Sequence, residues 1–171
     1  MAHTKNIVWF NGPSAGFFIH TLQKQPLEIG CNFIYRDRNV DHVVVYDWQM
    51  FQHIDDGPYK LWCRNGQKDP RFTEVNYTAR QMPHNSGVLA LRLAINLRLD
   101  HVFVVGCDWG ISHKSRYNYG KRNSELKYTN SQKHLLKQMS DEIDMTFVNA
   151  NRIDVDCHQV SPAKFLSSLN S

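Results

Sequence analysis

A turn near the N-terminus has the residue types that can hold a phosphate-sized anion. The turn Asn11–Gly16, with the sequence Asn-Gly-Pro-Ser-Ala-Gly, follows the apolar run Asn6–Phe10, and we expect a helix to begin at about Phe17. A glycine such as Gly12 lets the main chain approach a ligand closely. Ser14 offers a hydroxyl, and the first N–H groups of the helix would point at the anion. An ordinary tight turn has the same composition, so both interpretations stay open.

A second set of main-chain N–H groups is expected where the strongly apolar helix Ser86–Leu97 begins. Asn85 and Ser86 are both residue types that cap helix N-termini, and capping alone would explain their presence. The N–H groups of Ser86 and Gly87 could also face the same ligand as the first turn. A residue can do both, so Ser86 and Gly87 are candidate ligand-binding residues.

Two aspartates directly follow predicted strands. Asp47 comes after the β-branched run His42–Tyr46, and Asp108 comes after the run His101–Gly106. In an open parallel sheet, ligands bind outside the carboxyl ends of the strands. Asp108 could hold a ribose hydroxyl, orient the loop that follows it, or bind a metal ion.

Basic and tyrosine side chains alternate in the polar segment Asp108–Asn123 and just beyond it. They are Lys114, Arg116, Lys121, Arg122 and Lys127, interleaved with Tyr117 and Tyr119. Such a mixture can clamp a phosphate or stack on a base. A solvated loop has the same composition.

Two acidic clusters elsewhere have simpler explanations. The tripeptide Asp154-Val155-Asp156 has the pattern of the paired aspartates in metal-dependent glycosyltransferases, but it is frequent by chance and lies far along the chain from the other candidates. The run Asp55-Asp56-Gly57 is typical of a turn. We therefore predict no resident metal site or cofactor.

The candidates must be positioned by an alternation of strands and helices. Predicted strands or extended segments are Asn6–Phe10, Leu27–Tyr35, His42–Tyr46, a short strand within Gly57–Asp69, Thr73–Tyr77, His101–Gly106 and Met145–Val148. Predicted helices are Ser86–Leu97, Thr129–Met139 and a short C-terminal helix after Pro162. This alternation predicts an α/β fold, a Rossmann-like domain with a mostly parallel sheet flanked by helices, over residues 1–171.

Composition bounds the classes of protein that need considering. The chain has 171 residues, 42% of them hydrophobic and 21% charged, as in a folded globular protein with a single domain. No apolar run approaches the ~20 residues of a membrane span, and the N-terminus lacks the layout of a signal peptide. The net charge of +4 suits an anionic ligand but is too small to indicate a nucleic-acid partner.

Cysteine usage agrees with a cytoplasmic location. Cys31, Cys63, Cys107 and Cys157 are widely spaced, and none belongs to a pair with zinc-ligand spacing. We expect them to be reduced thiols, most of them buried.

Three segments together resemble the bacterial sialyltransferases that use CMP-sialic acid, and their relatives in the 6-hydroxymethylpterin pyrophosphokinase-like group. The first segment is Phe10–Ser14, which is similar to the opening glycine-bearing turn of that family. The second is Cys31–Tyr35, similar to its asparagine-bearing second strand. The third runs from Ser86–Val88 through Val105–Asp108, similar to its unit of helix, strand and Gly-x-Asp. Order and spacing agree over roughly residues 6–148, and the compact length is in keeping with a minimal member such as one from a phage.

The resemblance implies a nucleotide site. It places Asn11 and Ser14 near the phosphate of the donor, and Asn32 against the nucleotide or its sugar. Ser86 would approach the phosphate from the second helix. Asp47 stands where the family has another nucleotide-contacting asparagine.

The resemblance is less complete for catalysis. Tyr117 matches one of two tyrosines that stabilise the departing phosphate, whereas the other position falls on or near Gly110. The general-base histidine of the family has no counterpart in the segment 123–128, and His113 or His134 would have to replace it.

The leading hypothesis is a glycosyltransferase-like protein that binds a nucleotide or nucleotide sugar, for example a CMP-sugar, and transfers the sugar without a metal if it is active. The second is a nucleotide- or partner-binding module that has lost catalysis, since Pro83 and His84 also stand where the family has an arginine. The third is Mg²⁺-dependent phosphoryl transfer with Asp108 or Asp47 as ligand. Nucleic-acid binding through the basic loop is a weaker fourth, and homo-oligomerisation stays open.

Overall fold

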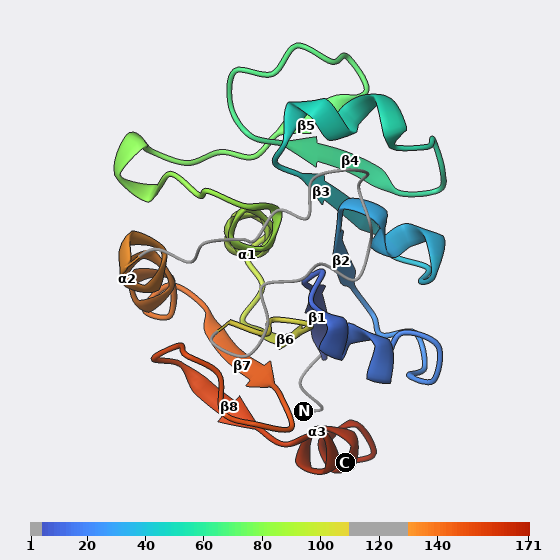
Figure 1. Cartoon of the computed structure of the whole chain (residues 1–171), viewed down its shortest axis with the longest axis vertical. Helices are drawn as coiled ribbons and strands as arrows, with labels where there is room; N and C mark the ends of the chain where they lie inside the picture. Colours follow the sequence, from blue (N-terminus) through green and yellow to red (C-terminus); the bar gives the residue numbers. More distant parts are fainter. Residues whose placement is uncertain (1–4, 110–129) are drawn as a thin grey trace.

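The computed structural model describes residues 5–109 and 130–171 and contains, within them, one eight-stranded parallel sheet (Figure 1). The strands are β1 (Asn6–Trp9), β2 (Glu28–Cys31), β3 (His42–Val45), β4 (Lys60–Cys63), β5 (Phe72–Glu74), β6 (His101–Val105), β7 (Asp144–Val148) and β8 (His158–Val160). Their order across the sheet is β5-β4-β3-β2-β1-β6-β7-β8, and every neighbouring pair is parallel. The predicted α/β fold with a parallel sheet is therefore confirmed.

Successive strands lie on one side of β1 in the first half of the chain and on its other side in the second half. From β1 the chain adds strands on one side up to β5, and then β6 pairs with the other side of β1. Such a reversal is a topological switch point, and ligands of open α/β sheets bind beside it at the carboxyl ends of the strands. Ile7, Val8 and Trp9 of β1 are fully buried because both faces of the sheet are covered, which explains the apolar character of this run.

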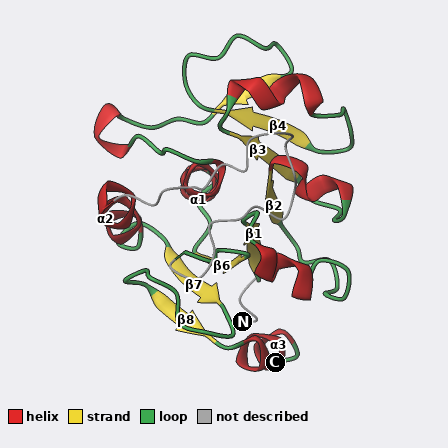
Figure 2. Ribbon diagram, viewed as in Figure 1, coloured by secondary structure: helices red, strands yellow, loops and turns green. Residues whose placement is uncertain are grey.

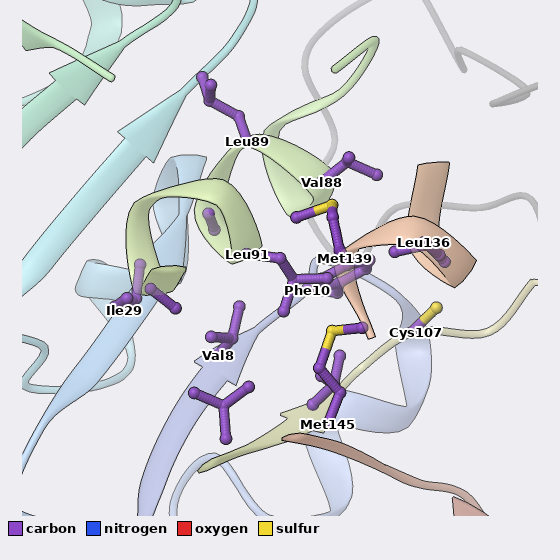
Figure 3. Packing of buried hydrophobic residues seen from close by; sticks show 14 of the residues in the cluster. Val8, Phe10, Ile29, Val88, Leu89, Leu91, Cys107, Leu136, Met139 and Met145 are labelled. Carbon is purple, nitrogen blue, oxygen red and sulfur yellow. The ribbon is translucent and has the colours of Figure 1, made fainter. Parts of the chain in front are cut away.

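Different elements cover the two faces (Figure 2). Helices α1 (Ser86–Asn96) and α2 (Asn130–Met139) cover one face, where Figure 3 shows Phe10, Leu91 and Met139 within one cluster. Short 3-10 helices and α3 (Pro162–Leu169) cover the other, where Phe165 is fully buried. In the described part of the chain, no helix is both long and apolar enough to cross a bilayer.

Two predicted elements differ from the structure. The helix expected from about Phe17 does not form, and residues Pro13–Phe17 make a 3-10 helix that places Ala15 against the sheet. Two glycines in this turn weaken the propensity for a longer helix. The strand predicted over Leu27–Tyr35 ends at Cys31, because Asn32 has a φ of 49° and begins a second 3-10 helix. Strand β8 was not predicted.

Candidate functional site

The turn after β1 lies directly on the end of β6. The N–H of Gly12 donates to the carbonyl oxygen of Gly106 over 2.8 Å, and Phe10 donates to Val105 over 2.7 Å. A Cβ atom on Gly12 would lie 2.2 Å from that carbonyl oxygen. Glycine is therefore required at position 12 by a contact inside the protein.

The carboxylate of Asp108 accepts a hydrogen bond from the N–H of Ser14, a main-chain donor that we expected an external anion to use. Its side chain is buried, and its Oδ2 atom accepts a 2.8 Å hydrogen bond from the N–H of Ser14. Its Oδ1 atom accepts from Nδ2 of Asn149 over 3.2 Å. The expectation of free N–H groups for a phosphate at the first turn is thus wrong for Ser14, because a carboxylate of the same chain already binds there.

The start of α1 is joined to the ends of β2 and β3 by one hydroxyl group. Oγ of Ser86 donates to Oδ1 of Asn32 over 3.0 Å and accepts from the N–H of Tyr46 over 3.0 Å. The left-handed φ of Asn32, a conformation that asparagine tolerates, belongs to this arrangement. Asn32 and Ser86, which the sequence analysis named separately as candidate nucleotide-binding residues, are therefore in direct contact.

Three donors at this end of α1 are not used inside the described structure. Asn85 caps the helix by accepting from the N–H of Val88 over 2.9 Å. Among the described residues, no hydrogen bond uses the N–H of Ser86, the N–H of Gly87 or the amide nitrogen of Asn32. These donors, together with the positive end of the helix dipole, suit a negatively charged group.

Phe10 connects the two turns. A Cβ atom on Gly87 would lie 2.5 Å from the Phe10 ring, so only glycine allows this close approach. The same ring makes an edge contact with Trp109, with 6.0 Å between the ring centroids. The turn after β1 and the start of α1 are thus neighbours at the same edge of the sheet.

The remaining predicted residues are more dispersed. Asp47 is exposed and caps a 3-10 helix by accepting from the N–H of Gln49 over 3.1 Å. His134 lies on the exposed side of α2, with its Nε2 atom 3.1 Å from Nε2 of Gln138. Tyr117 and His113 lie outside the described residues, as does Gly110. The described structure therefore brings Asn32 to Ser86 and Ser14 to Asp108, leaves Asp47 apart from these pairs, and adds no described catalytic histidine to them.

The acidic tripeptide lies nearer to the site than its sequence position suggested. The N–H of Asp154 donates to the carbonyl oxygen of Trp109 over 2.9 Å. Its carboxylate pairs with Lys133, and Asp156 pairs with Lys137 over 3.3 Å. In the described ranges, no three histidine, cysteine or acidic side chains are gathered as a metal site would require.

The thiols near this edge are protonated. Burial raises the pKa of Cys107 well above its ordinary value and also raises that of Cys31. All four cysteines are free. Burial therefore disfavours the thiolate form of Cys31 and Cys107.

Sequence reasoning missed Asn149. This residue immediately follows β7, whereas Asp108 lies three positions after the end of β6, and Asn149 is only 7% exposed. Its Nδ2 atom donates to the carbonyl oxygen of Cys107 over 2.9 Å as well as to Asp108. The rule that polar residues after parallel strands gather at one edge would have identified it.

Known proteins match the fold and not the sequence. No protein-family model and no curated protein sequence matches the chain. A crystal structure of the sialyltransferase Cst-II in complex with a trisaccharide acceptor and CMP matches with a TM-score of 0.61 and 16% identity, over 98% of this chain and 88% of that one. The same enzyme from Campylobacter jejuni in complex with CMP gives a TM-score of 0.65 and 15% identity, over 93% of this chain and 85% of that one. At these identities the likeness concerns the fold.

Proposed function

We propose that this chain is a glycosyltransferase-like protein that binds a nucleotide or nucleotide sugar at the carboxyl edge of its sheet. The observation that carries the proposal is the contact between Ser86 and Asn32, which leaves an amide nitrogen beside N–H groups of a helix start that no other described residue uses. Such a group of donors fits a phosphate. The buried carboxylate of Asp108, two strands away, fits hydroxyl groups instead.

The fold supports the same ligand class. The solved structures that the chain resembles contain CMP, and one contains a saccharide acceptor. A CMP-sugar is accordingly the first donor to test. The phosphate would lie at the start of α1, and its charge would be stabilised by the donors of Ser86, Gly87 and Asn32.

Sugar transfer would need no metal in this scheme. Tyr117 would stabilise the departing phosphate, and His113 or His134 would accept the proton of the acceptor hydroxyl. The bond between the sugar and the phosphate oxygen would break as the acceptor oxygen attacks the sugar.

A second candidate function is nucleotide binding without catalysis. The position of His134 favours it, because that ring lies on the exposed side of α2 beside Gln138. The sequence also has glycine at or near position 110, where the sialyltransferase family that it resembles has a tyrosine. Glycine has no hydroxyl group to stabilise a departing phosphate.

Calorimetry with CMP, UDP, GDP and ADP on the folded full chain tests the common premise. The decisive variant is Asn32→Asp, which retains an oxygen for Ser86 but replaces the amide donor with a negative charge. Its affinity for the bound nucleotide should fall about tenfold or more, equivalent to at least ~1.4 kcal/mol. The matched control is Asn39→Asp, the same charge change at an exposed position.

Each result has a distinct meaning. Absence of binding by all four nucleotides would overturn the proposal, and equal weakening by the two variants would exclude the site at Asn32. Formation of a sugar–acceptor product from a CMP-sugar and a saccharide acceptor in the presence of a chelator would establish transfer. Binding without such a product would establish the second candidate. Consumption of ATP that requires Mg²⁺ would instead indicate phosphoryl transfer.

A further inference from the structure

Arg64 directly follows β4 and lies on the face of the sheet that α1 covers. The register between β3 and β4 pairs Val45 with Cys63, so Tyr46 and Arg64 are the next residues of the two neighbouring strands. Tyr46 and Trp62 pack against the hydrophobic cluster that includes α1, and residues two positions apart on a strand share a face. The guanidinium of Arg64 lies over the Tyr46 ring, with 4.8 Å from Cζ to the ring centroid.

Tyr46 connects Arg64 to the start of α1. Its hydroxyl accepts a 3.2 Å hydrogen bond from Nη1 of Arg64. Its main-chain N–H donates to Oγ of Ser86, and the same oxygen donates to Asn32. A single residue therefore joins the guanidinium to the group of donors that we propose for the phosphate.

The guanidinium of Arg64 is held by neutral groups and has no carboxylate partner. With its amide oxygen directed at the guanidinium, Gln67 accepts from Nε over 2.9 Å and from Nη2 over 3.2 Å. No ion pair among the described residues includes Arg64. The other arginines whose guanidinium groups make hydrogen bonds in the described ranges all pair with a carboxylate, at 3.6 Å or less: Arg36, Arg38, Arg71 and Arg92. Arg64 is thus fixed in place but lacks a counter-charge.

The charge of a nucleotide phosphate exceeds what the start of α1 can compensate. A helix N-terminus is equivalent to about half a positive charge, whereas a phosphate monoester carries about 1.5 to 2 negative charges at pH 7. The amide of Asn32 and the main-chain N–H groups of Ser86 and Gly87 are neutral donors. A complete positive charge beside them would bind a phosphate more strongly.

We propose that Arg64 binds the phosphate of the nucleotide together with the donors at the start of α1. The inference rests on the proposed function and extends it by one residue. A guanidinium has five N–H donors in one plane, an arrangement that suits phosphate oxygens. Tyr46 and Gln67 use three of them, which leaves two for the ligand. Arg64 is only partly buried, so these donors are within reach of a ligand at the edge of the sheet.

The test measures by calorimetry the affinities of CMP and of cytidine, which lacks the phosphate, or of the corresponding pair for whichever of the four nucleotides binds. Arg64→Gln should weaken nucleotide binding about tenfold to a hundredfold, because charge-assisted hydrogen bonds to the phosphate are lost. Nucleoside binding should stay nearly unchanged. The matched control is Arg98→Gln, the same charge change at an exposed residue beyond the opposite end of α1, and it should preserve both affinities.

Arg64→Lys is the second variant and keeps the positive charge. Lysine lacks the planar pair of donors, so nucleotide binding should weaken about threefold and nucleoside binding should not change. If Arg64→Gln does not fold, as judged by urea unfolding, the affinities of Arg64→Lys decide the question.

The outcomes separate this inference from the proposed function. Equal weakening of nucleotide and nucleoside binding would assign Arg64 a structural role through Tyr46 and Gln67 and would overturn the inference. Unchanged nucleotide binding in the folded variant would overturn it as well, and both results would leave the proposed function intact. Absence of binding by CMP, UDP, GDP and ADP to the wild-type chain would remove the proposed function, and this inference with it.

Discussion

Asp108 binds the main-chain N–H of Ser14 across 94 positions of sequence, with 2.8 Å between Oδ2 and the nitrogen. The bond joins the end of β6 to the turn after β1, where these strands form the switch point of the sheet. The negatively charged group bound by the turn Asn11–Gly16 is thus a side chain of the same protein, the carboxylate of Asp108. In the proposed function, a phosphate would therefore bind at the start of α1.

Asp108→Ala should destabilise the fold by about 2–4 kcal/mol, because the N–H of Ser14 and the amide of Asn149 both lose their acceptor in a buried place. Asp108→Asn retains one carbonyl oxygen and should cost less. Urea unfolding at neutral pH measures both. The control is Asp100→Ala, which changes an exposed aspartate and should shift the free energy of unfolding by about 0.5 kcal/mol or less. Similar values for Asp108→Ala and Asp100→Ala would contradict this role.

The sequence was sufficient to predict that several polar segments lie at one edge of the sheet, because parallel strands place their carboxyl ends at the same edge. It did not predict the strand order, so the pairing of β1 with β6 and the contact between Asn32 and Ser86 come from the structure.

The sequence was not sufficient to predict which donors are already occupied. Whether Asp108 reaches Ser14 depends on the register between β1 and β6, in which Trp9 lies opposite Val105. That register is set by packing over the whole sheet. The 3-10 helix in place of the expected helix has a similar origin, because Ala15 packs against the sheet while Phe17 stays exposed.

Gly12→Ala should destabilise the chain by about 2–4 kcal/mol. The new Cβ atom would lie 2.2 Å from the carbonyl oxygen of Gly106 and 2.4 Å from Oδ2 of Asp108, and a main-chain oxygen cannot turn away as a side chain can. Thermal and urea unfolding measure the effect. Gly66→Ala is the control, because its φ of 84° is left-handed but no atom lies within 4 Å of the new Cβ. It should cost about 1 kcal/mol, and a larger loss at Gly66 than at Gly12 would refute the steric argument.

Arg38→Met should destabilise the fold by about 3–5 kcal/mol. The guanidinium binds both carboxylate oxygens of Glu28 at 2.7 Å, and Glu28 is fully buried. Without Arg38, the hydrogen bonds left to the carboxylate from described residues are those from Trp9 and Gln25, at 2.8 and 2.7 Å. A buried charge would then lack its counter-charge.

The control for the buried pair is an exposed one of similar length. Lys24 and Asp41 are 2.6 Å apart, with side chains 36% and 41% exposed. Lys24→Met should therefore cost less than about 1 kcal/mol. Equal losses for Lys24→Met and Arg38→Met in urea unfolding would show that burial does not decide the strength of these pairs.

The stability of the chain should decrease below about pH 6.5 because of His42. Burial lowers the pKa of His42 below its ordinary value of 6.5; the Asp41 carboxylate opposes this effect, while Lys60 and Lys24 add to it. In the folded protein, Nδ1 of neutral His42 accepts a 3.0 Å hydrogen bond from Nε1 of Trp62, and a proton on Nδ1 would abolish this bond.

The direction follows from proton binding. A histidine with a lower pKa in the folded state binds its proton more tightly when the chain is unfolded, so acid favours unfolding. The contribution of His42 is complete above pH 6.5 and is lost as the pH falls through its folded-state pKa. His42→Gln keeps an acceptor for Trp62 without titrating, and its free energy of unfolding should fall less than that of the wild type between pH 8 and 5. His20→Gln, at an exposed histidine, should follow the wild-type curve. Parallel curves for His42→Gln and the wild type would exclude His42 as the source of the pH dependence.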